Sequence, residues 1–150
     1  MEPVENMPSW MLTQTAAHAG RLVSEGFAAV GARGYHYRVL SALITDGPAS
    51  QADLGRRTGI HLSDMVTALN ELEASGYIRR VPNPDDRRRN IITITGHGIE
   101  RAEALALQAR AVQEEFLAPL DEAERAQLTA LLRKLYDHHL SQGFPPLSKM

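Results

Sequence analysis

Apolar residues recur at three- and four-residue spacing along most of the chain, with polar residues between them. This period is typical of amphipathic helices, because about 3.6 residues complete one helical turn. Glycine, proline and aspartate punctuate the pattern and mark the expected connections. The sequence therefore predicts helices over residues 9–30, 36–45, 50–59, 62–75, 98–116 and 121–140.

The third and fourth predicted helices are short and closely joined. Ser50 is the expected N-cap of the third helix, because its hydroxyl can accept from the N–H of Asp53, and Gly59 is placed to end that helix. Ser63 is the expected N-cap of the fourth helix. The buried stripe of the fourth helix is predicted to comprise Met65, Leu69 and Leu72. Two short helices with a glycine-containing connection are typical of a helix-turn-helix.

The period changes to two residues over Tyr77–Val81 and Ile91–Thr95, which are rich in β-branched and aromatic side chains. These runs predict two strands of a hairpin. The loop between them holds two prolines, two aspartates and three consecutive arginines. A helix-turn-helix followed directly by a hairpin is a winged helix, so the predicted fold is mainly α with a small β-hairpin wing.

Wide apolar stripes on the first, fifth and sixth predicted helices exceed what one small helix-turn-helix can cover. A twofold homodimer is the commonest way to bury such faces. We therefore expect a single domain over residues 1–150, with a winged helix-turn-helix core at about 36–95 and dimerisation helices at about 9–30 and 98–140. Residues 1–8 are expected to form a loose arm, and the proline-containing tail from Gly143 a docked one. No internal repeat is evident.

The composition of the chain excludes several classes of function but does not identify one. The formal net charge is −2, so only local clustering of charge can favour nucleic-acid binding. The absence of cysteine excludes disulfides, thiolate metal sites and thiol catalysis. No apolar run is long enough to span a membrane and no signal peptide is evident, so a cytoplasmic location is expected. No catalytic motif or cofactor-binding loop is found, and the six scattered histidines have no metal-ligand spacing.

Residues 50–95 resemble the MarR family of transcriptional regulators. The segment LGRRTGI is similar to the first helix and turn of the family's DNA-binding motif, and LNELEASGYIRR is similar to the end of its second helix. NPDDRRRNIITIT is similar to its wing, whose signature is D-x-R followed by a short β run. The helical flanks match in length and type. The resemblance implies a dimeric DNA-binding regulator, often controlled by a small molecule.

In that family the D-x-R pair of the wing acts as a unit, which here corresponds to Asp86 and Arg88. The carboxylate orients the guanidinium, and the arginine enters the narrow, electronegative minor groove. Arg87 and Arg89 are expected to point elsewhere and contact phosphates. The alternative is that this loop is only a solvated, charged turn.

The fourth helix is predicted to lie in the major groove. If its apolar stripe faces inward, the residues that face outward are Ser63, Val66, Thr67 and Asn70. This helix has no lysine or arginine, so basic contacts must come from its neighbours: Arg56, Arg57 and His61 before it, and Arg79 and Arg80 after it. Asn70 has two interpretations: it pairs with adenine, or it bonds within its own fold.

Effectors in the family often bind between the dimer helices and the helix-turn-helix. The matching positions are Trp10, Thr13, Gln14, His18 and Arg21 on the first helix, and Tyr35, His36, Tyr37 and Arg38 at the start of the second. Histidine and arginine beside aromatic rings suit an anionic or phenolic molecule. The alternative is that these aromatics are core and these histidines are only hydrogen-bonded.

The leading hypothesis is therefore a DNA-binding transcriptional regulator, a repressor, that binds an inverted-repeat operator as a homodimer and is released by a small effector. The competing hypothesis is a winged-helix protein-interaction module without DNA binding, which the lack of basic residues in the fourth helix supports. The arginine-rich wing favours the first, because phosphate is the most natural partner of clustered arginines.

Overall fold

The structure is a computed structural model that describes residues 1–143, which form six α-helices and a small antiparallel sheet. A single 3-10 turn at Val4–Asn6 precedes the first helix. The helices are α1 (Pro8–Ala28), α2 (Gly34–Asp46), α3 (Gln51–Thr58), α4 (Leu62–Ala74), α5 (Gly96–Phe116) and α6 (Glu122–Ser141). The strands are β1 (Ala49–Ser50), β2 (Ile78–Pro82) and β3 (Asn90–Ile94). The predicted class, mainly α with a β-hairpin wing, is confirmed.

Local capping chemistry explains where several helices begin and end. The hydroxyl of Ser50 accepts from the N–H of Asp53 at 3.2 Å, as predicted for the start of α3. Gly59 ends α3 in the left-handed region at φ 67°, a conformation that side chains disfavour. Asp121 and Glu124 form a reciprocal capping box at the start of α6.

The start of α4 differs from the prediction. Ser63 was expected to cap this helix, but α4 begins at Leu62 and its N-cap is His61, which makes no side-chain capping bond. Ile60 is buried, and Gly59 forms a left-handed turn just before it. The burial of Ile60 and this turn direct the chain into the helix two residues before the predicted N-cap. Tertiary packing has overridden the local hydroxyl signal here.

The wing is a three-stranded antiparallel sheet in the order β1-β3-β2. β2 pairs with β3 from Ile78 opposite Ile94 to Pro82 opposite Asn90, so the predicted hairpin is confirmed with bounds shifted by one residue. β1 was not predicted, because two residues are too few to show a period. Pro82 is tolerated because β2 is an edge strand.

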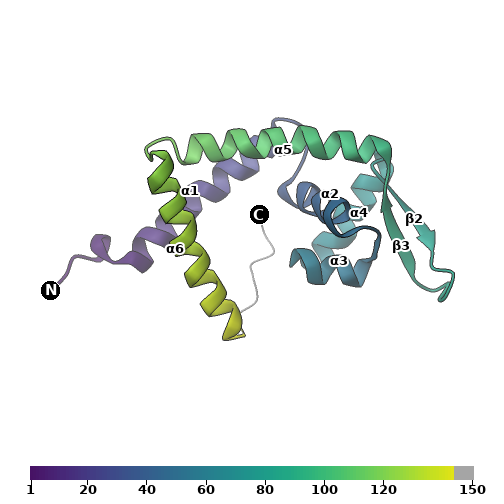
Figure 1. Ribbon diagram of the computed structural model, residues 1–150, viewed down its shortest axis with the longest axis horizontal. Coiled ribbons are helices and arrows are strands. Elements are labelled where there is room, and N and C mark those ends of the chain that lie inside the picture. Colours follow the sequence, from purple (N-terminus) through teal and green to yellow (C-terminus); the bar gives the residue numbers. More distant parts are fainter. Residues whose placement is uncertain (144–150) are drawn as a thin grey trace.

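The core lies where α2, α3 and α4 meet the sheet and the first half of α5. Its most buried large side chains are Leu40, Leu54, Met65, Leu69, Ile78, Ile92 and Leu105. The predicted stripe of α4 is confirmed, with Met65, Leu69 and Leu72 all buried. α1 and α5 lie side by side and extend away from this core, so the wing projects at the opposite end of the molecule from the N-terminus (Figure 1).

α6 turns back from the far end of α5, and none of its described residues is buried (Figure 1). Its exposed apolar residues include Leu131, Leu132, Leu135, Tyr136 and Leu140. Within residues 1–143, no helix has the length and apolar character needed to cross a membrane. Of the tail predicted to form a docked arm, residues 144–150 lie outside the described residues.

Candidate nucleic-acid interface and adjacent cavity

The outward face of α4 carries the four residues predicted to face DNA. Ser63, Val66, Thr67 and Asn70 are all exposed, because they lie on the side of the helix opposite its buried stripe. The hydroxyl of Thr67 donates to the backbone oxygen of Ser63 at 3.1 Å, which leaves its methyl group on the surface. This face is therefore largely neutral and offers short polar and apolar groups.

Asn70 and Arg80 are joined to each other. Nη2 of Arg80 donates to Oδ1 of Asn70 at 2.6 Å, and Nε of Arg80 lies 3.8 Å from Oε2 of Glu73. That Nε is buried and makes no hydrogen bond to the described residues. Of the two interpretations of Asn70, the structure shows the bond within its own fold. Arg80 thus ties strand β2 to α4 and is half-buried, whereas the neighbouring Arg79 is exposed and points to the other face of the strand.

The loop of the wing, residues 83–89, is closed by its own backbone. The N–H of Asn83 donates to the backbone oxygen of Arg89 at 2.8 Å, and the N–H of Asp86 donates to that of Asn83 at 3.2 Å. The side chain of Asn83 also accepts from the N–H of Asp85 at 2.9 Å, which makes an Asx-turn. These bonds hold the loop as consecutive turns, so its arginines are displayed from a defined backbone.

Asp86 lies between two of the three wing arginines. Its Oδ1 is 3.6 Å from Nε of Arg88 and accepts from the N–H of Arg88 at 3.1 Å. Its Oδ2 is 3.7 Å from Nε of Arg89. The predicted pairing of Asp86 with Arg88 is present, but Arg89 does not point elsewhere as expected, because the turn brings it back to the same carboxylate. The side chain of Arg88 is 95% exposed, which leaves its guanidinium available to a partner.

The two arginines of α3 have partners within the chain. Arg56 is paired with Asp53, and Nη1 of Arg57 donates to the backbone oxygen of Gly47 at 3.2 Å. The pKa of Asp53 is lowered, chiefly by its hydrogen bonds with Ser50 and further by Arg56, so this carboxylate stays ionised. Both arginine side chains remain accessible, but each contact with DNA would compete with an existing bond.

A groove of about 540 Å³ runs between the start of α3 and the wing. Its lining includes four arginines, Arg56, Arg80, Arg88 and Arg89. Ser50, at the start of α3, and Asn90, at the start of β3, supply polar groups at its walls. A groove with this charge beside an exposed helix face suits the phosphate backbone of a nucleic acid.

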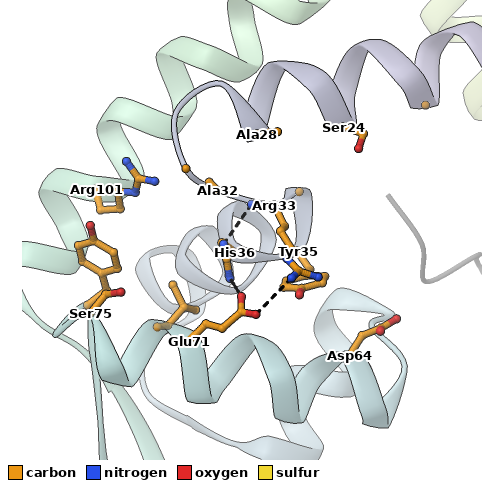
Figure 2. Close-up of a pocket in the computed structure, with 15 residues that line it drawn as sticks. Ser24, Ala28, Ala32, Arg33, Tyr35, His36, Asp64, Glu71, Ser75 and Arg101 are labelled. Atoms are coloured by element: carbon orange, nitrogen blue, oxygen red, sulfur yellow. Dashed lines mark hydrogen bonds and ion pairs between the residues drawn. The ribbon is translucent and has the colours of Figure 1, made fainter.

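A larger cavity, of about 1040 Å³, lies behind α4, between the second half of α1, the start of α2 and the inner side of α4 (Figure 2). Its polar lining comes from Ser24, Arg33, Tyr35, His36, Asp64, Glu71, Ser75 and Arg101. The hydroxyl of Tyr35 is buried and has no hydrogen-bond partner among the described residues. Burial, then the carboxylate of Glu71, raises the pKa of this hydroxyl.

His36 is the buried polar residue at the back of this cavity. Its Nδ1 accepts from the N–H of Arg33 at 3.1 Å, and its Nε2 lies 2.5 Å from Oε2 of Glu71 (Figure 2). Arg33 places Nη2 at 3.6 Å from the other carboxylate oxygen of Glu71. Burial lowers the pKa of His36, and this effect outweighs the opposing influence of Glu71.

The structure brings only part of the predicted effector site together. Tyr35 and His36 line the cavity. Trp10, Gln14, His18 and Arg21 lie along an exposed face of α1 and do not line it, and Arg21 pairs with Glu25 at 3.3 Å. Tyr37 stacks on Phe27 with 6.0 Å between ring centroids, next to the core. A role for these five residues in ligand binding stays a prediction.

Sequence reasoning missed the charged residues of the cavity, among them Arg33, Glu71 and Arg101. Arg33 precedes α2 in a glycine-rich connection that carries no motif. Glu71 lies on the fourth helix outside its predicted outward face, and Arg101 is distant in sequence from both. No sequence signal links the three, because their proximity depends on how α2, α4 and α5 pack. Among residues 1–143, no cluster of three or more histidine, aspartate or glutamate side chains could hold a metal ion.

A helix-turn-helix followed by an antiparallel wing, flanked by long helices, defines a winged helix-turn-helix protein. Residues 31–89 match the sequence profile described as the MarR family. The chain is 32% identical over 104 residues to the HTH-type transcriptional repressor NicR of Pseudomonas putida. This match covers 69% of this chain and 66% of NicR. The chain belongs to the MarR family, whose members are transcriptional regulators and not enzymes.

Two solved structures support the same assignment. A probable transcriptional regulator from Pseudomonas aeruginosa superposes with a TM-score of 0.77 at 28% identity, covering 89% of this chain and 99% of that one. PcaV of Streptomyces coelicolor, solved in complex with its natural ligand, superposes with a TM-score of 0.72 at 25% identity, covering 91% and 96%. The aligned part spans slightly less than two thirds of the length of NicR.

Proposed function

We propose that this protein is a DNA-binding transcriptional repressor that uses α4 and the wing together. The supporting observation is that one arginine-lined groove holds both the exposed Arg88 of the wing and Arg80, which bonds Asn70 on the exposed face of α4. In this arrangement α4 enters the major groove and the wing contacts the adjacent minor groove. Because α4 itself carries no basic residue, most of the affinity comes from the arginines around it.

The DNA-bound form is a homodimer on an inverted repeat. α6 has no buried residue, and apolar side chains on α1 and α6 are exposed, including Trp10, Met11, Leu12, Leu131 and Leu135. A twofold dimer buries such faces and places two copies of α4 at matched half-sites. The symmetry of the operator then mirrors the symmetry of the protein.

A small anionic or phenolic effector releases the DNA by binding in the cavity behind α4. Two groups support this ligand class: Arg33, at the mouth of the cavity, provides a cation, and the Tyr35 hydroxyl provides an unpartnered hydrogen-bonding group. Asp64, Glu71 and Leu72 of α4 line the same cavity, so a ligand there contacts α4, the proposed recognition helix, itself. Differential binding to two positions of α4 would shift the population away from the DNA-binding form.

The test is the affinity for a DNA fragment carrying the protein's own promoter, measured by fluorescence anisotropy at several salt concentrations. Each phosphate contact contributes about −0.9 to the slope of log affinity against log salt, so several contacts give a steep negative slope. Arg88→Ala is expected to weaken binding by about 1–3 kcal/mol.

The matched control is Arg110→Ala, an exposed arginine of α5 that lies about 21 Å along that helix from its start beside the wing. It removes the same charge from another part of the surface and should leave affinity within about twofold. An affinity that barely responds to salt would exclude the DNA-binding function and favour the protein-interaction alternative. Equal effects of the two substitutions would remove the wing from the mechanism.

A further inference from the structure

His36 connects the start of α2 to the recognition helix through both of its ring nitrogens. Nδ1 faces the backbone N–H of Arg33 at 3.1 Å, and Nε2 faces Oε2 of Glu71 at 2.5 Å (Figure 2). Glu71 lies on α4, next to Asn70 and one turn after Thr67 on the exposed face. The contacts from Arg33 through His36 to Glu71 therefore form a polar tie between the start of α2 and α4.

The two bonds determine where the imidazole carries its proton. A backbone N–H can only donate, so Nδ1 must present a lone pair to Arg33. The ring proton then sits on Nε2, where it donates to the carboxylate of Glu71. Protonation of Nδ1 would place two N–H groups against each other and break the bond from the Arg33 N–H that holds the start of α2. Both bonds are satisfied together only by the neutral Nε2–H tautomer.

The polar tie is directional, so it can fix the rotation of α4 about its axis, which apolar packing alone does not. Met65, Ala68, Leu69 and Leu72 bury one side of α4, which sets how deeply the helix sits. Its N-terminus has no side-chain cap, so no hydroxyl fixes that end. The His36–Glu71 bond and the ion pair of Glu71 with Arg33 restrain the rotation of α4 about its axis, and hence where its exposed residues point.

We infer that His36, as the neutral Nε2–H tautomer, is a positioning residue for DNA recognition that holds α4 through Glu71, and that its protonation weakens DNA binding. This inference rests on the proposed DNA-binding function. His36 does not contact DNA itself, because it is buried behind α4. It acts through the helix that does.

The charges around His36 favour the neutral form. Arg33, which precedes α2, and Arg101 of α5 are cations, and Glu71 of α4 is the one carboxylate bonded to the ring. Tyr35 packs edge-on with 5.0 Å between ring centroids, and Asp64 of α4 lines the same cavity. Burial and the two arginines lower the pKa of His36 below its ordinary value. Conformations in which the His36–Glu71 bond is broken leave His36 with its ordinary pKa, so they bind a proton at this ring more readily than the closed conformation. As the pH falls below about 6.5, protonation therefore favours these open conformations.

The tautomer is tested directly by nitrogen-15 NMR of the histidine side chains in the full-length protein near pH 7.5. The expected result is an acceptor-type shift for Nδ1 of His36 and a protonated, pyrrole-type shift for Nε2. A Nδ1–H tautomer or a doubly protonated ring would overturn the inference, whatever the protein does with DNA.

The functional test compares promoter-DNA affinity of the native protein and His36→Gln from about pH 8 to about pH 5.5 at constant salt. Glutamine can accept from Arg33 and donate to Glu71 at once, and it does not titrate. The native protein and His36→Gln differ in no other ionisable group, so every other effect of pH on DNA binding is common to both. The readout is therefore the ratio of the two affinities at each pH.

We expect His36→Gln to bind within about threefold of the native protein at the alkaline end and the native protein to lose at least about fivefold relative to it in acid. His36→Leu, checked for folding by its melting temperature, should bind about tenfold more weakly throughout. An affinity ratio that stays constant with pH, or His36→Leu binding that matches the native protein, would overturn the positioning role. Absence of DNA binding by the native protein at about pH 8 would instead show that the proposed function has failed, and the inference with it.

Discussion

At the scale of single residues, the tightest point of the fold is the start of α5. A Cβ on Gly98 would lie 2.0 Å from the backbone oxygen of Tyr77 and 2.8 Å from Cγ1 of Ile94. The side chain of Thr95 links the two segments at this point. Its hydroxyl donates to the backbone oxygen of Gly76 at 2.6 Å and accepts from the N–H of Gly98 at 3.0 Å. The glycine is required because α5 and the wing meet backbone to backbone.

Gly98→Ala is therefore expected to lower the free energy of unfolding by about 1–3 kcal/mol, because backbone atoms must move to admit the methyl group. Gly96→Ala is the control, since a Cβ at Gly96 meets nothing within 4 Å. It should be neutral or slightly stabilising, because alanine restricts the unfolded chain more than glycine does. Urea denaturation of both variants measures the difference, and equal midpoints would show that this contact is not tight.

At the scale of elements, the cavity exists because α1, α2 and α4 meet around residues that do not fill the space between them. Its wall includes the small residues Gly20, Ala28 and Ala32. The hydroxyl of Tyr35 is buried there without a hydrogen-bond partner, which is a cost unless a ligand satisfies it. The guanidinium of Arg33 lies over the Tyr35 ring, 5.7 Å from its centroid, so a cation stands beside that hydroxyl-bearing ring.

Isothermal titration calorimetry with 4-hydroxybenzoate tests this site as a phenolic-acid pocket. Tyr35→Phe is expected to weaken binding of 4-hydroxybenzoate about tenfold while leaving benzoate nearly unchanged, since only the first ligand offers a hydroxyl. The fold should tolerate the substitution, because the phenyl ring fills the same space and the ion pair of Arg33 with Glu71 is kept. If both ligands weaken equally, or neither binds the native protein, Tyr35 is not the recognising group or the ligand class is wrong.

At the scale of the whole molecule, one subunit leaves much apolar surface without a partner. Leu131 of α6 is 63% exposed and Leu135 is 50% exposed, and these two residues share a helix face because they are four positions apart. The intrinsic helix propensity of its residues would stabilise an unpacked α6 only slightly, since most helix stability in proteins comes from packing. The proposed homodimer supplies the missing contact.

Light scattering after size exclusion is expected to give twice the chain mass of 16.5 kDa for the native protein. Leu131→Glu combined with Leu135→Glu should shift it toward monomer and abolish specific DNA binding, because buried charges oppose the interface. Arg133→Glu is the control, since it places the same side chain on the opposite face of α6. A double variant that remains dimeric would exclude this face from the interface.

Much of the fold could be predicted from sequence because local signals were strong and agreed. The period of the apolar residues located all the long helices, Ser50 marked a true helix start, and β-branched runs located β2 and β3. Predictions failed where tertiary contacts prevailed over local ones. The burial of Ile60 moved the start of α4 away from Ser63, and strand β1 arose only by pairing with β3.

The sequence by itself determined the winged helix-turn-helix, the outward face of α4 and the arginine-rich wing, because these depend on spacing within short segments. The resemblance to the MarR family implied the Asp86–Arg88 pair. Only the tertiary structure decided that Asn70 bonds Arg80, that Arg89 returns to Asp86, and that Arg33, His36 and Glu71 meet behind the recognition helix. The physical reason is that these contacts join groups whose separation depends on packed helices and a closed turn. Local periodicity contains no information on which charged side chains such packing brings together.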